Sequence, residues 1–407
     1  MLNIAGFLAG LRRWLTSGVA SAQTSKENAG LAALRVDANA GNASAQFSLG
    51  FMYHDGQGVP QDDVEAVSWY RRAADQGDVF AQFSLGYAYT NGEGVPQDDA
   101  QAVAWFCKAA EQGEAEAQTS LGNAYHDGRG VPQDDVQAVS WYRQAADQGY
   151  ARAQFRLGGA YQLGNGVPQD VVEAAAWYRK AADQGDAAAQ SMLGYMYHHG
   201  EGVPQDDVEA AEWYRRAAEQ GHAVAQNNLG FMYDRGLGVP QDDAQAVTWY
   251  RKAAEQGYAG AQTNFGYSYS LGRGVPQDDA QAATWFRKAA DQGNAVAQFN
   301  LGAMHTNGQG VPQDDVEAVS WYLKSAEQGY ADAQYNLGVV YHNGQGVPQD
   351  DVEAHKWRNL ATSRASAADQ KRFAESRDAL ASLMTPQQVA DAQQRATDWL
   401  AAFEQRN

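Results

Sequence analysis

Histidines supply the most obvious candidate chemistry in this sequence, and four of the eight recur at one place in a repeated pattern: His54, His126, His198 and His342. Zinc binds nitrogen and sulfur ligands at roughly 2.0–2.3 Å from a common centre. Packed helices lie roughly 8–10 Å apart, so histidines on separate repeats are too far apart to share a metal ion. We therefore expect structural or surface roles for these rings, and no metal site.

Paired aspartates also recur, beginning with Asp62-Asp63 and Asp98-Asp99. They could be catalytic carboxylates or ligands of a divalent cation along an acidic edge. However, Glu65 follows Asp62 by three residues, which is the spacing of a capping box at a helix start. In that motif Asp62 accepts from early backbone N–H groups while Glu65 reaches back to the N–H of Asp62. Capping is the interpretation that the spacing favours.

Two further features do not indicate catalysis or cofactor binding. The Gly-x-Gly of each repeat, as at Gly56 and Gly58, follows a helix, whereas the glycines of a phosphate-binding loop follow a strand and open a helix. Cys107 has no histidine or acid beside it in a pattern that suggests an activated thiol. We predict no catalytic, cofactor-binding or metal-binding residues, and a protein that is not an enzyme.

Composition limits the classes of partner. The net charge of −19 repels nucleic-acid phosphates and anionic membranes, so we expect no nucleic-acid ligand. A single cysteine excludes an intramolecular disulfide and leaves the redox compartment open. No apolar run reaches the ~18 residues of a membrane-spanning helix. The sequence favours a monomer that binds protein or peptide ligands.

The pattern behind these features is a repeat of 36 residues that begins at Ala43 and occurs nine times without insertion, through residue 366. Each repeat indicates two helices. In the first, Ala45, Leu49, Gly50 and Tyr53 share one face, and Gly50 allows close approach of another helix. Glycines then end the helix, and a proline keeps it from continuing.

The second helix of each repeat carries a wide apolar stripe that includes Trp69 and Tyr70. One hairpin of this size cannot bury such rings alone, whereas stacked neighbours can, which is the logic of a solenoid. We expect Trp213, the equivalent of Trp69 in the fifth repeat, to lie between the helices of its repeat and to touch the next one.

These residues resemble a known family. The pattern A-x-A-Q-x-x-L-G-x-x-Y-x-x-G-x-G-V-P-Q-D-x-x-x-A-x-x-W-Y-x-x-A-A-x-Q-G is similar to the Sel-one-like repeat, a relative of the tetratricopeptide repeat. The resemblance implies an all-α, right-handed α/α solenoid of nine helix-turn-helix repeats with terminal capping helices. It also implies a scaffold or adaptor role in assembling other proteins.

The ends of the chain depart from the repeat. Residues 1–26 form an N-terminal leader, which the sequence allows to be an amphipathic helix or a weak export signal. Residues 27–42 align with half a repeat and should cap the front, and residues 367–407 should form capping helices at the back. Thr385, Pro386 and Gln388 indicate an N-cap, a first-turn proline and a capping box.

Positions that vary within a fixed repeat are free to serve recognition. In the first helix of each repeat these are positions two, five, nine, twelve and thirteen, counted from Ala43. In tetratricopeptide-like superhelices, such positions line the concave groove. We expect a peptide-binding groove that includes Phe47, Phe51, Phe83, Tyr87, Phe155, Tyr195, Asn227, Phe231, Arg235, Tyr267, Phe299 and Tyr335. The alternative is that the aromatic residues at positions five and nine pack between neighbouring helices.

The sequence thus favours a non-enzymatic scaffold that binds proteins or peptides through an aromatic-lined groove. The alternative function is that of exported relatives with an enzymatic, glycan-binding or β-lactam-binding role in the cell envelope. Paired cysteines in each repeat are typical of those relatives, and this chain has only Cys107. The sequence does not decide between a cytoplasmic and an exported location.

Overall fold

The computed structural model describes residues 23–406, which form 21 helices and no strand. Most of the leader, residues 1–22, lies outside the described part of the chain, and the two interpretations of it stay predictions. The first described helix, α2 (Gln23–Asn39), lies against the first helix of the first repeat, where Ala38 is fully buried. These observations confirm the all-α repeat architecture.

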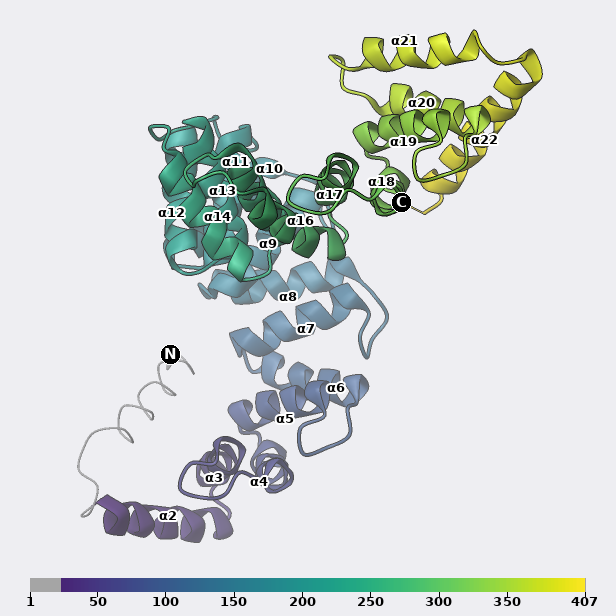
Figure 1. The fold of residues 1–407 in the computed structure, drawn as a ribbon. Helices are drawn as coiled ribbons and strands as arrows, with labels where there is room; N and C mark the ends of the chain where they lie inside the picture. Colours follow the sequence, from purple (N-terminus) through teal and green to yellow (C-terminus); the bar gives the residue numbers. More distant parts are fainter. Residues whose placement is uncertain (1–22, 407) are drawn as a thin grey trace. The chain divides into compact units, whose positions relative to one another are not determined.

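Each repeat contains two helices of about equal length, which pack against each other (Figure 1). The first helices of the repeats are α3 (Ala43–Asp55), α5 (Val79–Asn91), α7 (Ala115–Asp127), α9 (Ala151–Leu163), α11 (Ala187–His199), α13 (Ala223–Arg235), α15 (Ala259–Leu271), α17 (Ala295–Asn307) and α19 (Ala331–Asn343). The second helices are α4 (Asp63–Asp75), α6 (Asp99–Glu111), α8 (Asp135–Asp147), α10 (Val171–Asp183), α12 (Asp207–Glu219), α14 (Asp243–Glu255), α16 (Asp279–Asp291), α18 (Asp315–Glu327) and α20 (Asp351–Arg364).

The chain divides into two compact modules between Asp186 and Ala187. The N-terminal module contains the first four repeats. The C-terminal module contains the other five repeats and the last two helices, α21 (Gln370–Ala381) and α22 (Pro386–Glu404). Each module is described by itself below.

Two glycines in each loop have different tasks. Gly56 ends α3 in the left-handed conformation, with φ of 68°, which costs a glycine little. The second loop glycine permits close contact between repeats. A Cβ on Gly94 would lie 2.1 Å from the backbone oxygen of Asp63 in the preceding repeat. Because Gly94 also has φ of 69°, no other residue fits there.

The aspartates cap the second helices as expected, but the prediction that Glu65 accepts from the backbone N–H of Asp62 is wrong. Asp62 accepts a hydrogen bond from the backbone N–H of Glu65 at 3.0 Å. The N–H of Asp62 instead donates to the carbonyl oxygen of Tyr53, and Glu65 accepts from the indole N–H of Trp69 at 3.1 Å. The loop therefore holds Asp62 through its backbone, which releases Glu65 to orient the tryptophan. The complete box occurs where the sequence also indicates one, at Thr385 and Gln388.

The apolar stripe of each second helix faces two neighbours. Tyr250 packs with the first helix of the following repeat, and its ring also fills the space beside Gly230, where a Cβ would approach within 2.7 Å. Trp249, one residue earlier, packs instead with α12 of the preceding repeat and with α13. Adjacent helical residues point about 100° apart, which separates the two contacts.

The expected forward contact of Trp213 is therefore wrong for its equivalents in the C-terminal module. Trp285 and Trp321 join the clusters formed by the preceding second helix and their own first helix. Trp213 itself is buried, with 3% of its surface exposed. The tryptophans reach back along the repeat array and the tyrosines reach forward.

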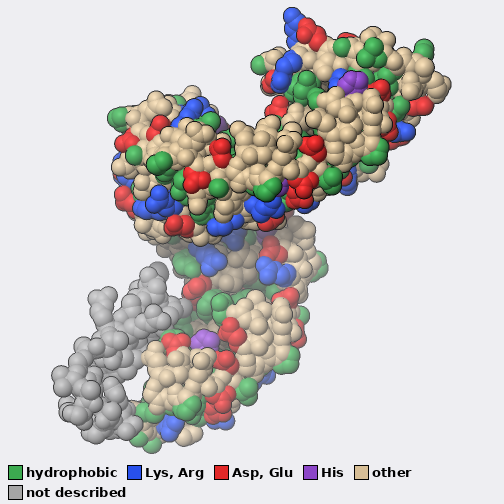
Figure 2. All heavy atoms as spheres, viewed as in Figure 1, with side chains coloured by type: hydrophobic (Ala, Val, Ile, Leu, Met, Phe, Trp, Pro, Cys, Tyr) green, Lys and Arg blue, Asp and Glu red, His purple; other side chains and the backbone are tan. Residues whose placement is uncertain are grey.

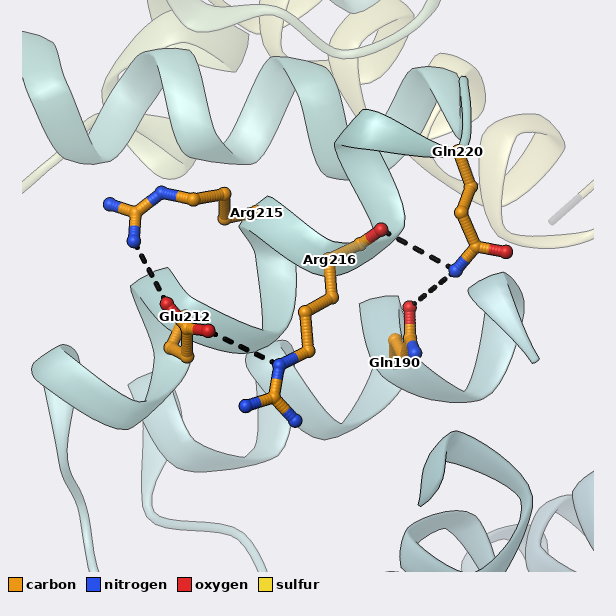
Figure 3. A network of polar contacts seen from close by, with 5 residues as sticks. All are labelled: Gln190, Glu212, Arg215, Arg216 and Gln220. Carbon is orange, nitrogen blue, oxygen red and sulfur yellow. Dashed lines mark hydrogen bonds and ion pairs between the residues drawn. The ribbon is translucent and has the colours of Figure 1, made fainter. Parts of the chain in front are cut away.

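A buried glutamine at position four of each first helix joins three segments. Gln226 donates from Nε2 to the carbonyl oxygen of Ala218 at the end of α12, at 3.0 Å. Its Oε1 accepts from Nε2 of Gln256, which follows α14, at 2.7 Å. Figure 3 shows the equivalent pair in the fifth repeat, in which Gln220 contacts both Gln190 and the carbonyl oxygen of Arg216. Gln226 thus fixes α13 to its own second helix and to the repeat before it.

Replacing Gln226 with Leu should cost roughly 1–3 kcal/mol of unfolding free energy, because a buried side chain loses both of its hydrogen bonds, the one to the carbonyl oxygen of Ala218 and the one from Gln256. Gln256→Ala is the matched control. It removes only the exposed partner, whose place at Oε1 of Gln226 water can take, and should cost about 0.5–1.5 kcal/mol. Urea denaturation gives the free energies, and hydrogen exchange should show the loss concentrated in α12–α14 because contacts in a solenoid are local. Equal costs for the two variants would contradict the role assigned to the buried amide.

The last two helices pack against α20. Phe373 of α21 is fully buried and stacks on Tyr335, with ring centroids 4.5 Å apart. Trp399 of α22 contacts Trp357 at 6.0 Å. Arg364, which occupies the place of the paired glutamine, lies over the ring of Phe403. The change of sequence in the ninth repeat therefore replaces contacts to a further repeat with contacts to α21 and α22.

One buried histidine makes this region sensitive to pH. His355 occupies the place that Val67 and Val319 hold in other repeats, and 2% of its surface is exposed. Burial lowers the pKa of the imidazole, and the nearby Arg377 and Arg358 act in the same direction while Asp378 opposes them. The neutral ring is therefore the form that the folded protein favours.

Stability should consequently fall as the pH drops below about 6.5, where the unfolded chain begins to bind a proton at this residue and the folded chain resists it. We expect His355→Val to lose less stability than the wild type between pH 7.5 and pH 5.5. Urea denaturation of both proteins at both pH values measures this difference. An identical pH dependence would show that His355 does not contribute.

Candidate functional site

The recurring histidines each contact an aspartate of their own repeat and do not converge. His126 Nδ1 lies 2.6 Å from the carboxylate of Asp135, at the start of the second helix, and the same pair occurs at His54, His198 and His342. Within residues 23–406, no group of three His, Cys, Asp or Glu side chains is arranged to hold a metal ion. The histidines therefore link the two helices of their own repeats.

Aromatic residues at position five of the first helices pack within the structure. Phe155 lies against Tyr178 of its own second helix, with ring centroids 5.4 Å apart. Phe83 makes the same contact with Phe106 at 5.8 Å. The pattern extends to three more of the expected groove residues, Phe47, Phe299 and Tyr335, each of which has a ring contact. The rings at position five are thus packed on other rings, with Phe47 buried and the other four half-buried.

Aromatic residues at position nine are more accessible. Tyr87 is 52% exposed, and Tyr195 and Phe231 are each 37% exposed. Phe51 is half-buried. Tyr267 is also half-buried, because its ring meets Phe286 edge-on at 5.2 Å and its hydroxyl accepts from Asn300. Position nine is therefore the better source of rings for a ligand.

The two polar groove residues are partly engaged. Asn227 accepts a hydrogen bond from Asn264 of the next repeat at 2.9 Å. Arg235 lies over the ring of Phe231 at 5.8 Å and pairs with Asp234 at 3.1 Å. Phe231 and Arg235 thus form one accessible patch, whereas Asn227 mainly joins α13 to α15.

The N-terminal module contains two cavities along its first helices. The larger has a volume of about 350 Å³ and is lined on α3 and α5 by Phe47, Phe51, Phe80, Phe83 and Tyr87. The smaller, of about 220 Å³, lies between α6 and α7, and its wall includes Phe106, Asn123 and Tyr150. Tyr87, Glu116 and Arg152 line both cavities. Several expected groove residues are therefore brought together around a real hollow.

Charged groups surround these rings. Asp63 and Glu93 line the larger cavity, Asp99 and Arg129 the smaller one, and Glu116 and Arg152 both. Burial raises the pKa of the Glu116 carboxyl, while a hydrogen bond from Tyr150 and the charge of Arg152 oppose that shift. Burial and the charge of Glu116 raise the pKa of Tyr150 to about 12, so its hydroxyl remains a donor.

Sequence reasoning missed Phe80, Glu116 and Tyr150. Phe80 and Glu116 occupy position two of the first helices, which the sequence identifies as variable but which supplies none of the expected groove residues. Tyr150 precedes α9 and takes the place of an N-cap without capping the helix. Three repeats have a tyrosine at this place, Tyr150, Tyr258 and Tyr330, where five others have Asn, Asp or Glu, and this difference is a signal that could have identified it.

Other surface features carry no comparable arrangement. Figure 2 shows acidic and basic side chains interspersed over the face that it draws. On the second helices, Glu212 pairs with both Arg215 and Arg216 (Figure 3), a kind of exposed network that contributes little to stability. Burial raises the pKa of the half-buried Cys107 thiol, which disfavours the reactive thiolate. None of the described helices is long and apolar enough to cross a bilayer.

The different packing of positions five and nine can be tested with two variants in the N-terminal module. Phe155→Ala should cost roughly 2–4 kcal/mol, because it removes a ring that packs on Tyr178. Tyr87→Ala should cost under about 1 kcal/mol, because half of the side chain is already in solvent. Urea denaturation followed by circular dichroism measures both. A larger cost for Tyr87→Ala would show that its ring is a core element.

Comparison with known families gives a match over most of the chain. The Sel1 repeat model matches residues 43–78, 79–114, 115–150, 151–186, 187–222, 223–258, 259–294, 295–330 and 331–364. These ranges agree with the repeats recognised from the sequence. A comparison with curated proteins gives no significant match.

Two solved structures are similar over most of their own length. One is a protective antigen present in uropathogenic Escherichia coli strains and displays an SLR fold; it is 36% identical, covers 92% of this chain and 95% of its own, and has a TM-score of 0.53. The other is a Sel1 repeat protein from Oxalobacter formigenes, 36% identical over 80% of this chain and 98% of its own, with a TM-score of 0.59.

Proposed function

The chain belongs to the Sel1 repeat family, and on that premise we propose that it is a non-enzymatic scaffold or adaptor that holds protein or peptide segments against its first helices. Proteins of this family commonly serve as scaffolds for protein interactions. The observation that carries the proposal is an accessible aromatic ring at position nine of the first helix, where the repeated pattern does not require an aromatic residue. Tyr87, Tyr195 and Phe231 supply such rings in the two modules.

Aromatic rings with nearby polar groups are typical of surfaces that bind peptides. In the C-terminal module, the rings of Tyr195 and His199 lie 4.2 Å apart, and Phe231 lies 6.4 Å from His198. Arg235 adds a cationic group over Phe231. This patch, formed by α11 and α13, could bind a short segment of a partner through stacking and hydrogen bonds. No constellation of the described side chains favours the alternative enzymatic or β-lactam-binding role.

The test is a pair of substitutions in this patch, Tyr195→Ala with Phe231→Ala. Because both rings are partly exposed, the helical circular dichroism spectrum should stay nearly unchanged. If each ring anchors a partner, its loss should weaken binding by ~2 kcal/mol or more. Immobilised wild-type and variant proteins are compared by affinity purification with mass spectrometry, and each protein lost from the variant is then titrated against both.

Val208→Ala with Val316→Ala is the matched control, because these valines are 65% and 67% exposed at the start of second helices in the same module. The control should retain every partner of the wild type. If the aromatic variant folds and also retains every partner, the first-helix surface of the C-terminal module is not the binding site.

A further inference from the structure

Taking the proposed scaffold function as its basis, we infer that the two cavities of the N-terminal module bind a basic segment of a partner protein, in which bulky apolar side chains stand next to lysine or arginine. The observations that lead to this partner are the size of the cavities, the residues that they share and the charge of their walls. All of them come from α3–α9 and the loops between these helices.

The cavities fit side chains better than a whole folded element. A cavity of about 150 Å³ is large enough for a benzene ring, and these measure about 220 and 350 Å³. The larger one has phenylalanines on two successive first helices, including Phe51 and Phe80. Each cavity can therefore take at least one large aliphatic or aromatic side chain and remove its apolar surface from water.

Three shared residues make the two cavities one binding surface. Tyr87 stands between them, and half of its side chain is exposed, so it can stack on a peptide that crosses from one cavity to the other. Glu116 and Arg152 also contact both. A segment that fills both cavities must therefore pass these two charged groups.

The charges around the surface favour a cationic segment. Four carboxylates line the cavities, from Asp63, Glu93, Asp99 and Glu116, against the two guanidinium groups of Arg129 and Arg152. Arg129 also pairs with Asp127, and His54 of the larger cavity contacts Asp63. The carboxylates nevertheless outnumber the guanidinium groups two to one. The surface is therefore acidic within an acidic protein, and it attracts lysine and arginine side chains.

Glu116 is the group that we expect to meet the cation. Its carboxylate lies in a partly buried position, accepts from the Tyr150 hydroxyl and faces Arg152. An ammonium or guanidinium group placed there gains a charge-assisted hydrogen bond to a half-buried carboxylate. An acidic segment would be attracted by Arg152 but repelled by Glu116 and the other three carboxylates, so acidic partners should be excluded.

The test uses four fluorescent peptides that share one glycine-serine frame. The first carries phenylalanines and lysines, the second replaces the lysines with glutamates, the third replaces them with glutamines, and the fourth keeps the lysines but replaces the phenylalanines with serines. Fluorescence anisotropy with the full chain measures their affinities. The phenylalanine-lysine peptide should bind about tenfold more tightly than the third and fourth peptides, and the glutamate peptide should not bind measurably.

Protein variants locate the binding. Glu116→Gln should weaken the phenylalanine-lysine peptide about tenfold, while Arg152→Gln should leave its affinity unchanged or increase it. Asp147→Asn is the control, because it removes one negative charge from an exposed position on α8, away from the cavities. Tyr87→Ser gives a second probe at an exposed side chain, where folding is not at risk. It should weaken all phenylalanine peptides.

The outcomes separate this inference from the proposed function. Equal binding of the lysine and glutamine peptides, lost in Tyr87→Ser, would overturn the basic partner and leave a peptide-binding surface in place. Equal effects of Glu116→Gln and Asp147→Asn would overturn it as well, because binding would then follow only the net charge of −19. If no peptide binds, the cavities are not a docking site, whereas the scaffold function is decided independently by the Tyr195 and Phe231 variants.

Discussion

The repeated structure depends on one buried side chain, the glutamine at position four of every first helix. An amide can donate and accept at once, and the glutamines use both abilities to join segments on either side of them, except in the ninth repeat, where Gln334 only donates. Gln262, for example, donates to the carbonyl of Ala254 and accepts from Gln292. Because the glutamine is buried, an error in the spacing of either helix would leave polar atoms without partners, at a considerable cost. The helices of successive repeats are therefore held in register.

That register explains why the residues that recur in every repeat can vary so little. With the helices fixed by the glutamines, Gly266 must leave space for Phe286, whose ring a Cβ would approach within 2.8 Å. Likewise, Gly274 lies so close to the backbone of Asp243 in the preceding repeat that a side chain cannot fit there. The small residues and the aromatic residues of the frame are complementary, and each depends on the spacing that the amide bonds set.

The same constraint leaves a few positions free for recognition. Position nine lies on the first helix where neither the amide bonds nor the apolar stripe of the second helix determines its residue. Tyr87 and Phe231 can therefore remain exposed without disturbing the stack. In the N-terminal module, the variable positions also surround two cavities with acidic walls. A scaffold of this kind can change its ligand through such residues while its frame stays constant.

The sequence by itself determined the repeat length, the two helices in each repeat and the ends of those helices, because these follow from local periodicity and from capping residues. It also indicated that Gly50 allows close packing, which the ring of Tyr70 confirms. It did not reveal that Glu65 orients Trp69 instead of completing a capping box, since the loop carbonyl of Tyr53 takes the N–H of Asp62.

Only the tertiary structure decided which variable side chains face solvent. Positions five and nine lie on nearly the same face of the first helix, so their periodicity cannot separate them. The ring at position five, such as Phe155, meets the tyrosine of the second helix. At position nine, Tyr87 and Phe231 are exposed, whereas Tyr267 meets Phe286 of the second helix. The cavities likewise combine Phe47, Glu116 and Arg152 from three different repeats. Such proximity depends on how successive repeats stack, which no local pattern in the sequence records.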